Sequence, residues 1–316
     1  MSSPWSAGLR SVALNVPDLA LAETFYTTTW HLEVAARGQV HESDSKSDSE
    51  GNSKSDVLYL RGTGADAYLL ALHAGGPQVQ LREVTLRARD ASALTAIAAA
   101  TVQAGGRVLS PVAPLQAPGG GVALTLCDAD GRRFQVLHGD TLNTNVMQVK
   151  DRPQRLAHVV LNSHDVAATQ RFMQVAFGFT LADRTRIMAF MNCNRDHHSI
   201  ALGDADNDAL NHIAFLMPDV DSVMRGGGRM KDAGHAIEWG PGRHGPGDNA
   251  FNYFVGPFGE VIEYTAEVEQ IDDNHVARGP TDWTWPPGRV DQWGISAPPS
   301  ARLKAAQRAV FFMPSV

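Results

Sequence analysis

Three polar residues stand on strand faces that otherwise carry small or branched apolar side chains. They are His158, His212 and Glu263, and their sequence separations are 54 and 51 residues. A buried carboxylate without a partner is costly, and a divalent metal ion compensates its charge. Two histidines and one carboxylate leave half of an octahedron open, as in the facial triad of non-haem Fe(II) oxygenases, and Mn(II) accepts the same ligands. If the three faces line one pocket, they form a metal site.

Three further residues in the same half of the chain are suited to proton transfer. His198 begins a predicted strand, His244 lies in a Gly-rich segment, and Tyr253 falls on the strand before Glu263. A histidine near its ordinary pKa gives or takes a proton at neutral pH, and a phenol donates a hydrogen bond. Taken singly, His197 or His198 also fits an ordinary surface histidine, and Tyr253 an ordinary core residue.

An internal repeat organises the chain around these residues. Residues 14–18 align with 161–165 at an offset of 147, and residues 81–90 align with 210–219 at an offset of 129. Alternating strands, amphipathic helices and Gly, Asp or Pro turns within each unit predict a βαβββ pattern. The four predicted units are about 9–75, 80–138, 155–204 and 209–268. In the last unit the predicted strands are 210–217, 236–239, 250–256 and 260–266, with a helix at 219–233.

The repeat also serves as a control for the metal hypothesis. It places Ser11 under His158, Glu83 under His212 and Gln135 under Glu263. Ser, Glu and Gln cannot form the same triad, so we expect the first half to have a structural role.

The predicted architecture is α+β, with four βαβββ modules paired into two tandem domains whose curved, barrel-like mixed sheets close around a pocket. We expect an N-terminal domain without a metal site at 1–145, a catalytic domain at 146–268, and a tail at 269–316 that packs on the catalytic domain. Within the first domain, 41–56 is rich in Ser, Asp and Lys and is predicted to be a flexible loop inserted between two strands.

Composition narrows the classes of partner. The chain has 316 residues, a formal net charge of −7 and two cysteines. An acidic chain lacks the positive field that attracts nucleic acid or anionic membranes. So few cysteines fit a reducing compartment, and the N-terminus shows no signal-peptide pattern. We therefore expect a cytoplasmic protein that binds neither nucleic acid nor membrane.

The second half resembles the type I extradiol ring-cleaving dioxygenases of the vicinal oxygen chelate superfamily, which includes the catechol, 2,3-dihydroxybiphenyl and homoprotocatechuate dioxygenases. The family signature runs here from His244 through Tyr253, Pro257 and Gly259 to Glu263. Asn252 and Gly256 depart from that pattern. The segment 193–202 is similar to the part of the family that bears the catalytic histidine, and Ser-Ile-Ala after His198 assigns that role to His198.

The resemblance implies a specific reaction, the degradation of an aromatic compound by an oxidoreductase that inserts both oxygen atoms. His158, His212 and Glu263 would hold Fe(II), with Mn(II) as the other option, and a catechol and O2 would bind there. His198 would be the acid–base catalyst, while Tyr253 and His244 would hydrogen-bond the substrate. The product would be a hydroxymuconic semialdehyde or its analogue, and a homo-oligomer is expected.

Other activities remain open, because the same scaffold resembles glyoxalase-like isomerases, thiol transferases and metal-free small-molecule binders. The ring substituent is also open. Trp239 stands where relatives that take carboxylated catechols often carry Arg, which favours a neutral or apolar substituent. Arg243 and Arg289 are the candidates for an anionic one, and Trp283, Trp285 and Trp293 of the tail offer apolar walls.

Overall fold

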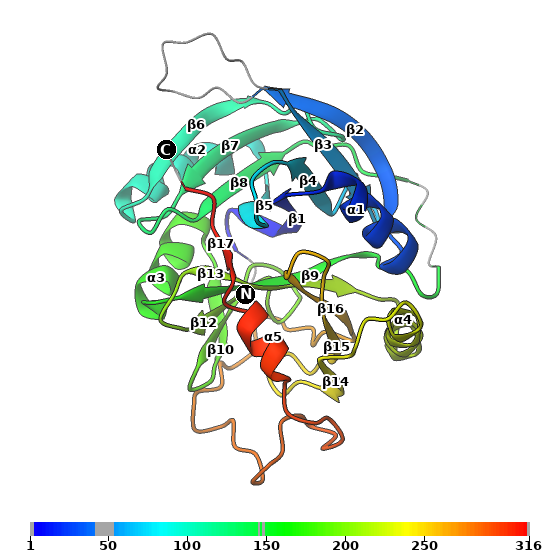
Figure 1. The fold of residues 1–316 in the computed structure, drawn as a ribbon. Coiled ribbons are helices and arrows are strands. Elements are labelled where there is room, and N and C mark those ends of the chain that lie inside the picture. The colour runs from blue at the N-terminus through cyan, green and yellow to red at the C-terminus, as the bar shows by residue number, and fades with distance from the viewer. Residues whose placement is uncertain (1–2, 42–53, 145, 147–148, 315–316) are drawn as a thin grey trace.

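The computed structural model describes residues 3–41, 54–144, 146 and 149–314, which form four βαβββ units in a row (Figure 1). The first two units share an eight-stranded sheet with the strand order β2-β3-β4-β1-β5-β8-β7-β6. Its elements are β1 Ser6–Val16, α1 Leu19–Thr24, the π-helical turn η1 Phe25–Thr29, β2 Glu33–His41, β3 Lys54–Arg61, β4 Leu70–Ala74, β5 Gln80–Ala88, α2 Ala91–Gln103, β6 Arg107–Pro114, β7 Val122–Cys127 and β8 Arg133–His138.

The last two units share a second sheet with the order β10-β11-β12-β9-β13-β16-β15-β14. Its elements are β9 Arg155–Ser163, α3 Val166–Phe177, β10 Thr180–Arg184, β11 Met188–Asn192, β12 Ile200–Asp204, β13 Ala209–Leu216, α4 Val220–Asp232, β14 Trp239–Arg243, β15 Ala250–Val255 and β16 Val261–Ala266. The predicted α+β class and the four modules are confirmed. Both sheets are curved in Figure 1, and each keeps two edge strands, so the barrel-like sheets are open rather than closed.

The four α-helices within the modules begin in the same way. At each start an aspartate side chain accepts a hydrogen bond from the backbone N–H three residues later, which satisfies one of the free donors of the first turn. These caps are Asp18, Asp90, Asp165 and Asp219. The cap recurs because each module places its helix directly after its first strand.

The strand registers confirm the alignment of the repeats. In the first sheet Ala13 pairs with Glu83, and in the second Val160 pairs with His212, at the predicted offsets of 147 and 129. The parallel pairs β5–β8 and β13–β16 also match. Thr85 pairs with Gln135 in the first sheet, and the equivalent Ala214 pairs with Glu263 in the second. Ser11, Glu83 and Gln135 therefore occupy the places of the three candidate ligands.

A shared apolar core joins the two halves. Trp30, fully buried, stacks on Tyr264 with ring centroids 3.6 Å apart, and Phe134 meets Phe177 edge to face at 5.2 Å. Such aromatic pairs bury large areas and prefer these geometries. Arg132 of the first half also pairs with Asp208 of the second.

The tail lies along the second sheet and returns to the first (Figure 1). Helix α5, Ala301–Ala306, contributes the buried Leu303 to an apolar cluster with Phe251, Tyr253 and Val261 of the second sheet. Strand β17, Val310–Phe311, then pairs with β13, and Met313 N–H donates to the Leu81 carbonyl of the first sheet.

The segment predicted to be a loop, 41–56, is described only at its ends. Strand β2 runs to His41 and β3 begins at Lys54, and these two strands pair antiparallel, so the ends of the segment are strand rather than loop. Residues 42–53 lie outside the described residues.

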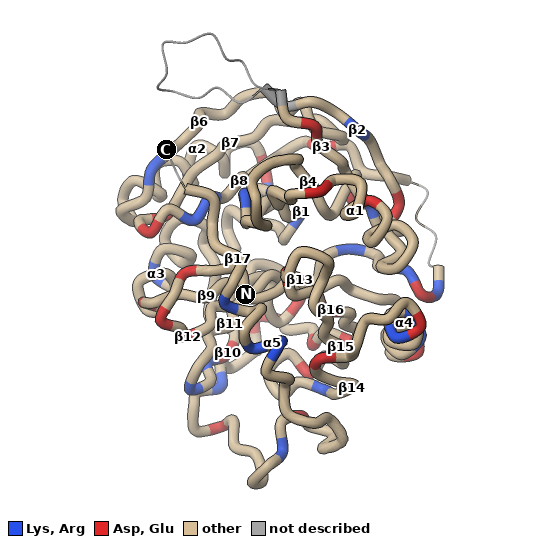
Figure 2. Tube along the Cα trace, viewed as in Figure 1, with Lys and Arg blue, Asp and Glu red and all other residues tan. Residues whose placement is uncertain are grey.

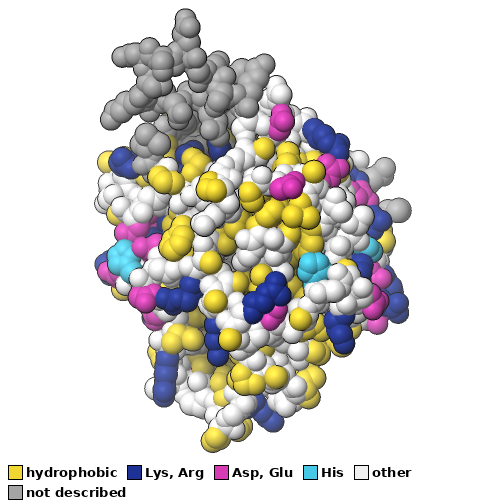
Figure 3. Space-filling model, viewed as in Figure 1, with side chains coloured by type: hydrophobic (Ala, Val, Ile, Leu, Met, Phe, Trp, Pro, Cys, Tyr) yellow, Lys and Arg dark blue, Asp and Glu magenta, His cyan; other side chains and the backbone are white. Residues whose placement is uncertain are grey.

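Charges of both signs are scattered over the chain in Figure 2, and on the face in Figure 3 they are interspersed with apolar side chains. None of the helices in the described ranges has the length and apolar content needed to traverse a lipid bilayer.

Candidate metal centre

The three candidate ligands come from three adjacent strands of the second sheet. Strand β13 lies between β9 and β16, and Ala214 on β13 pairs with His158 on one side and with Glu263 on the other. His212 lies two residues before Ala214 and therefore on the same face. The register alone brings the three side chains together on one face of the sheet.

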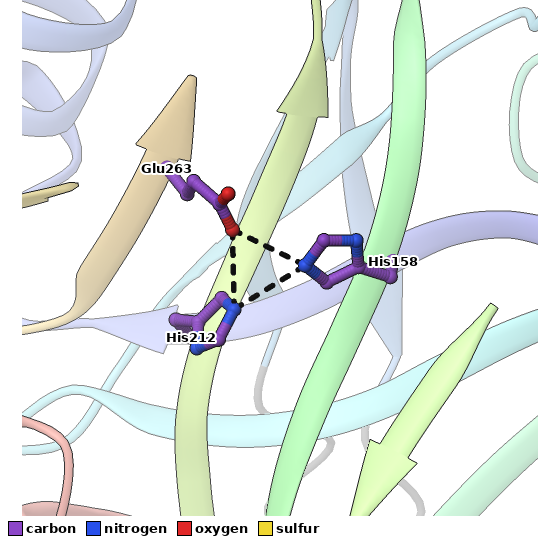
Figure 4. Close-up of side chains that lie close together, drawn as sticks. All are labelled: His158, His212 and Glu263. Atoms are coloured by element: carbon purple, nitrogen blue, oxygen red, sulfur yellow. Dashed lines mark hydrogen bonds and ion pairs between the residues drawn. The ribbon is translucent and has the colours of Figure 1, made fainter. Parts of the chain in front are cut away.

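The ligand atoms form a small triangle (Figure 4). The His158 Nε2 atom lies 3.1 Å from Glu263 Oε2 and 3.4 Å from His212 Nε2, and the third side is 3.2 Å. All three residues are at most 5% exposed. Among the described residues, no fourth His, Cys, Asp or Glu joins this group.

This donor set fits a divalent ion of the first transition row. Two ligands at about 2.1 Å from a metal and 90° apart are separated by about 3.0 Å, and at a tetrahedral angle by about 3.4 Å. The observed sides of the triangle lie in that range. Imidazole and carboxylate donors are those that Fe, Mn, Co and Zn accept.

Neighbouring groups set the protonation states of His212 and Glu263. In the tautomer that lets His212 Nδ1–H donate to Asn211 Oδ1, over 2.8 Å, the Nε2 atom keeps its lone pair for a metal. Burial lowers the pKa of His212 to about 4, so this ring is neutral. Burial alone raises the pKa of Glu263, but the neighbouring His158 outweighs it and holds that pKa well below its usual value, so the carboxylate is ionised.

Tyr253 and His244 adjoin the triangle. His244 Nε2 lies 3.0 Å from the Tyr253 hydroxyl, and this hydroxyl lies 3.4 Å from His212 Nε2. Burial, reinforced by Glu263, raises the pKa of Tyr253 well above its usual value, so the phenol keeps its proton. The His244 ring stacks on Phe251 with centroids 4.0 Å apart, and it keeps a 20% exposed side chain.

His198 lies over the first ligand, with ring centroids of His158 and His198 4.3 Å apart. Burial, together with His158, lowers the pKa of His198 well below its usual value, so this imidazole is neutral. Its Nδ1 atom lies 3.1 Å from Nδ1 of His197. The interpretation of this adjacent pair as surface histidines is wrong, because His197 is fully buried and His198 is 3% exposed.

The groups that support this pair were not predicted from the sequence. His197 Nε2 lies 2.8 Å from Asp183 Oδ2, and a Cβ added to Gly247 would lie 3.0 Å from Cε1 of His198. Gly247 also has φ of +81°, a conformation that favours glycine. Two adjacent histidines between polar residues were the only signal in the sequence for such a cluster.

The candidate pocket residues fall into two sets. The Trp239 ring stacks on Tyr253 at 5.0 Å and meets His244 at 5.2 Å, and its indole N–H is buried without a partner in the described part of the chain. By contrast, Arg243 pairs with Glu267 and lies over the Trp293 ring. Arg289 lies against Gly294 of the tail.

The strand predicted at 236–239 is displaced, and the Gly-rich segment itself forms β14 at Trp239–Arg243. Pro241 is tolerated there because β14 is an edge strand. Gly242 is required by proximity, since a Cβ at that position would lie 2.5 Å from the Phe251 ring.

Between the 245–248 turn and the tail lies a cavity of about 410 Å³. Its lining includes Trp283, Trp285, Arg278 and Glu269. Arg278 is already engaged there, because it pairs with both Asp183 and Glu269.

Residues 155–264 match the family model described as the glyoxalase/bleomycin resistance protein/dioxygenase superfamily. Over the full chain, the structure is similar to the Mn(II)-bound glyoxalase from Novosphingobium aromaticivorans, with 30% identity, a TM-score of 0.81 and coverage of 96% of this chain and 94% of that one. The chain belongs to this superfamily.

Two further matches are a metapyrocatechase and a homoprotocatechuate 2,3-dioxygenase. Metapyrocatechase 2 from Cupriavidus necator is 34% identical over 155 residues, which is 46% of this chain and 46% of that protein. The alignment thus spans about half the length of the curated relative. A variant of homoprotocatechuate 2,3-dioxygenase from Brevibacterium fuscum has the same fold, with a TM-score of 0.76 at 20% identity over 93% of this chain and 80% of that one.

Proposed function

We propose that this protein is an extradiol dioxygenase that opens a catechol ring with O2 at a mononuclear site formed by His158, His212 and Glu263. The observation that carries the proposal is the placement of three side chains suited to proton transfer, His198, His244 and Tyr253, around the three ligand atoms. No fourth His, Cys, Asp or Glu of the described residues joins those atoms. The metapyrocatechase relative and the homoprotocatechuate dioxygenase fold support the choice of reaction.

A metal bound here would supply Lewis-acid and redox chemistry and would hold the catechol oxygens beside O2. The protein residues handle the protons. Neutral His198 accepts a proton from a catechol hydroxyl as the substrate binds, and it returns that proton during ring opening. Tyr253 remains protonated and donates a hydrogen bond to a substrate oxygen, while His244 orients that phenol over 3.0 Å.

The chemistry yields a ring-opened hydroxymuconic semialdehyde-type product and fits a role in the degradation of aromatic compounds. We assign Fe(II) as the working metal and Mn(II) as its substitute, because both accept two imidazoles and a carboxylate. We also propose that the protein acts as a homo-oligomer, which light scattering on the purified protein would test.

The ring substituent in this proposal is neutral or apolar. Trp239 offers an aromatic wall beside Tyr253 and His244. Of the two arginines considered for an anion, Arg243 pairs with Glu267 and Arg289 lies against Gly294 of the tail. An anionic substituent would need Arg243 to give up its pairing with Glu267, which costs the energy of that ion pair.

The test is anaerobic reconstitution with Fe(II), followed by catechol, methylcatechols, 2,3-dihydroxybiphenyl or homoprotocatechuate in air. Yellow ring-opened product with one O2 consumed per ring supports the proposal. The neutral catechols should be cleaved with higher kcat/KM than homoprotocatechuate. Full metal loading without O2 uptake on any of these substrates would refute ring cleavage.

A metal-dependent glyoxalase-like isomerase is the second candidate, favoured by the 30% identical Mn(II)-bound glyoxalase that matches almost the whole chain. The same Fe(II)- and Mn(II)-loaded samples are assayed with the adduct of methylglyoxal and glutathione. Isomerisation that needs no O2 would select this activity, and O2-dependent ring opening would select the first.

A further inference from the structure

A buried chain of hydrogen-bonding groups leads away from His198. His198 Nδ1 lies 3.1 Å from His197 Nδ1, and His197 Nε2 lies 2.8 Å from Asp183 Oδ2. Asp183 and His197 are fully buried and His198 is 3% exposed. In such an environment each donor must meet an acceptor, because an unpaired buried polar group is costly.

We propose that Asp183 and His197 are positioning residues that fix His198 in the tautomer whose Nε2 atom is unprotonated and available to the substrate. The effect on turnover rests on the proposed ring-cleavage function. The tautomer of His198 does not depend on that function.

The tautomer follows from the order of donors and acceptors along the chain. A carboxylate only accepts, so His197 must carry its hydrogen on Nε2. If this is the one hydrogen on the His197 ring, Nδ1 has a lone pair. Because two lone pairs cannot bond, His198 Nδ1 carries the hydrogen and donates it to His197. The remaining nitrogen of His198, Nε2, keeps its lone pair.

Arg278 already matches the charge of Asp183, so this carboxylate needs no second positive charge from His197. Arg278 donates to the Asp183 carboxylate through its guanidinium at 2.8 Å and through its backbone N–H at 2.8 Å. His275 Nε2 also lies 3.6 Å from this carboxylate, and Glu269 shares Arg278 at 2.8 Å. Burial acts to raise the pKa of Asp183, but His197 and Arg278 hold it below its usual value, so Asp183 remains an acceptor.

The same positions in the first half lack these groups. The offsets of 147 and 130 that align the two sheets place Ala36 under Asp183, Ala67 under His197 and Tyr68 under His198. Alanine can neither accept nor donate through its side chain. The hydrogen-bonded chain is therefore restricted to the half that carries the metal triangle, as expected if it serves the site rather than the fold.

The direct test is ¹⁵N NMR of histidine-labelled protein loaded with diamagnetic Zn(II). The proposal predicts that His198 has a protonated Nδ1 and an unprotonated Nε2, and that His197 is neutral with its hydrogen on Nε2. In His197→Leu, His198 loses its acceptor and should become a mixture of tautomers. A wild-type His198 with its hydrogen on Nε2, or a doubly protonated His197, would overturn the proposal even if no catechol is ever cleaved.

Kinetics of the Fe(II) enzyme provide the second measurement. His197→Leu should lower kcat by about 10²-fold, the contribution of an oriented acid–base group, with KM changed less than about threefold. His197→Gln, whose amide oxygen can accept from His198, should recover part of kcat. His275→Gln is the matched control, since this residue contacts the same carboxylate but not His198, and it should keep wild-type kcat. Equal losses in His275→Gln and His197→Leu would show that the cluster only supports the fold.

Discussion

The Tyr26 hydroxyl donates a 2.7 Å hydrogen bond to Oε1 of Glu260, across a separation of 234 residues and between the two halves of the molecule. The Glu260 carboxylate also accepts from the Phe258 backbone N–H at 3.0 Å and folds back over Gly256, where any Cβ would lie 2.4 Å from it. Burial is the main influence and raises the pKa of Glu260 to about 7. A carboxylic acid three residues before a candidate ligand is therefore largely protonated at pH 6.

This pKa predicts a specific dependence of stability on pH. Between pH 4.5 and 7 the folded protein keeps the Glu260 proton and the unfolded chain loses it, so the free energy of unfolding falls as the pH rises. The fall is about 3 kcal/mol for a shift of this size, and it ends above pH 7. Urea unfolding at pH 4.5 and 7.5 measures it. Glu260→Gln, neutral in both states, should lose that part of the pH dependence; an unchanged difference would contradict the assignment.

Substitutions should separate metal binding from proton transfer. His212→Ala removes a donor and should abolish stoichiometric metal binding, whereas His198→Ala should retain the metal and lose about 10²- to 10⁴-fold in kcat. Elemental analysis and steady-state kinetics on the same samples provide the comparison. Equal metal loss in both variants would contradict the roles proposed for them.

Metal removal should destabilise the second half. A ligand that binds only the folded protein adds about 2.7 kcal/mol at a concentration 100 times its Kd. Chelation should therefore lower Tm, and added Mn(II) should restore it. In Glu263→Gln the Tm should not respond to Mn(II) at the same concentration, and a full response in that variant would refute this residue as a ligand.

Gly247→Ala should impair turnover through His198. The added methyl group would lie 3.0 Å from Cε1 of that ring, so we expect a several-fold lower kcat with the metal retained. Gly139→Ala is a matched control, because Gly139 has a similar φ of +77° but open space around its Cβ position. Similar kinetic losses in the two variants would mean that backbone strain alone accounts for the effect.

The three candidate metal ligands could be predicted because each stands out within the residue pattern of its own strand. Period-2 alternation identified the strand faces of His158, His212 and Glu263, and the repeat fixed their equivalence. The offsets depend only on the order of residues along the chain, and the strand registers agree with them.

The supporting contacts were not predictable, because they depend on packing between distant segments. Asp183 is fourteen residues from His197 but meets it only because β10 and the tail enclose that ring. The bond from Tyr26 to Glu260 has no periodic signature at all. Strand β14 was missed because Gly and Pro indicate a loop locally, while an edge position permits them in a sheet.

Because the registers align, the first sheet has positions equivalent to the three ligand positions of the second but carries other residues there. Ser11, Glu83 and Gln135 occupy the ligand places, and the last two already approach each other at 3.4 Å. The substitutions Ser11→His, Glu83→His and Gln135→Glu would give the first sheet the same three metal ligands. The native site of the second sheet would serve as the comparison in the same molecule. The duplicated scaffold thus makes one molecule a starting point for designing paired, independently tunable sites.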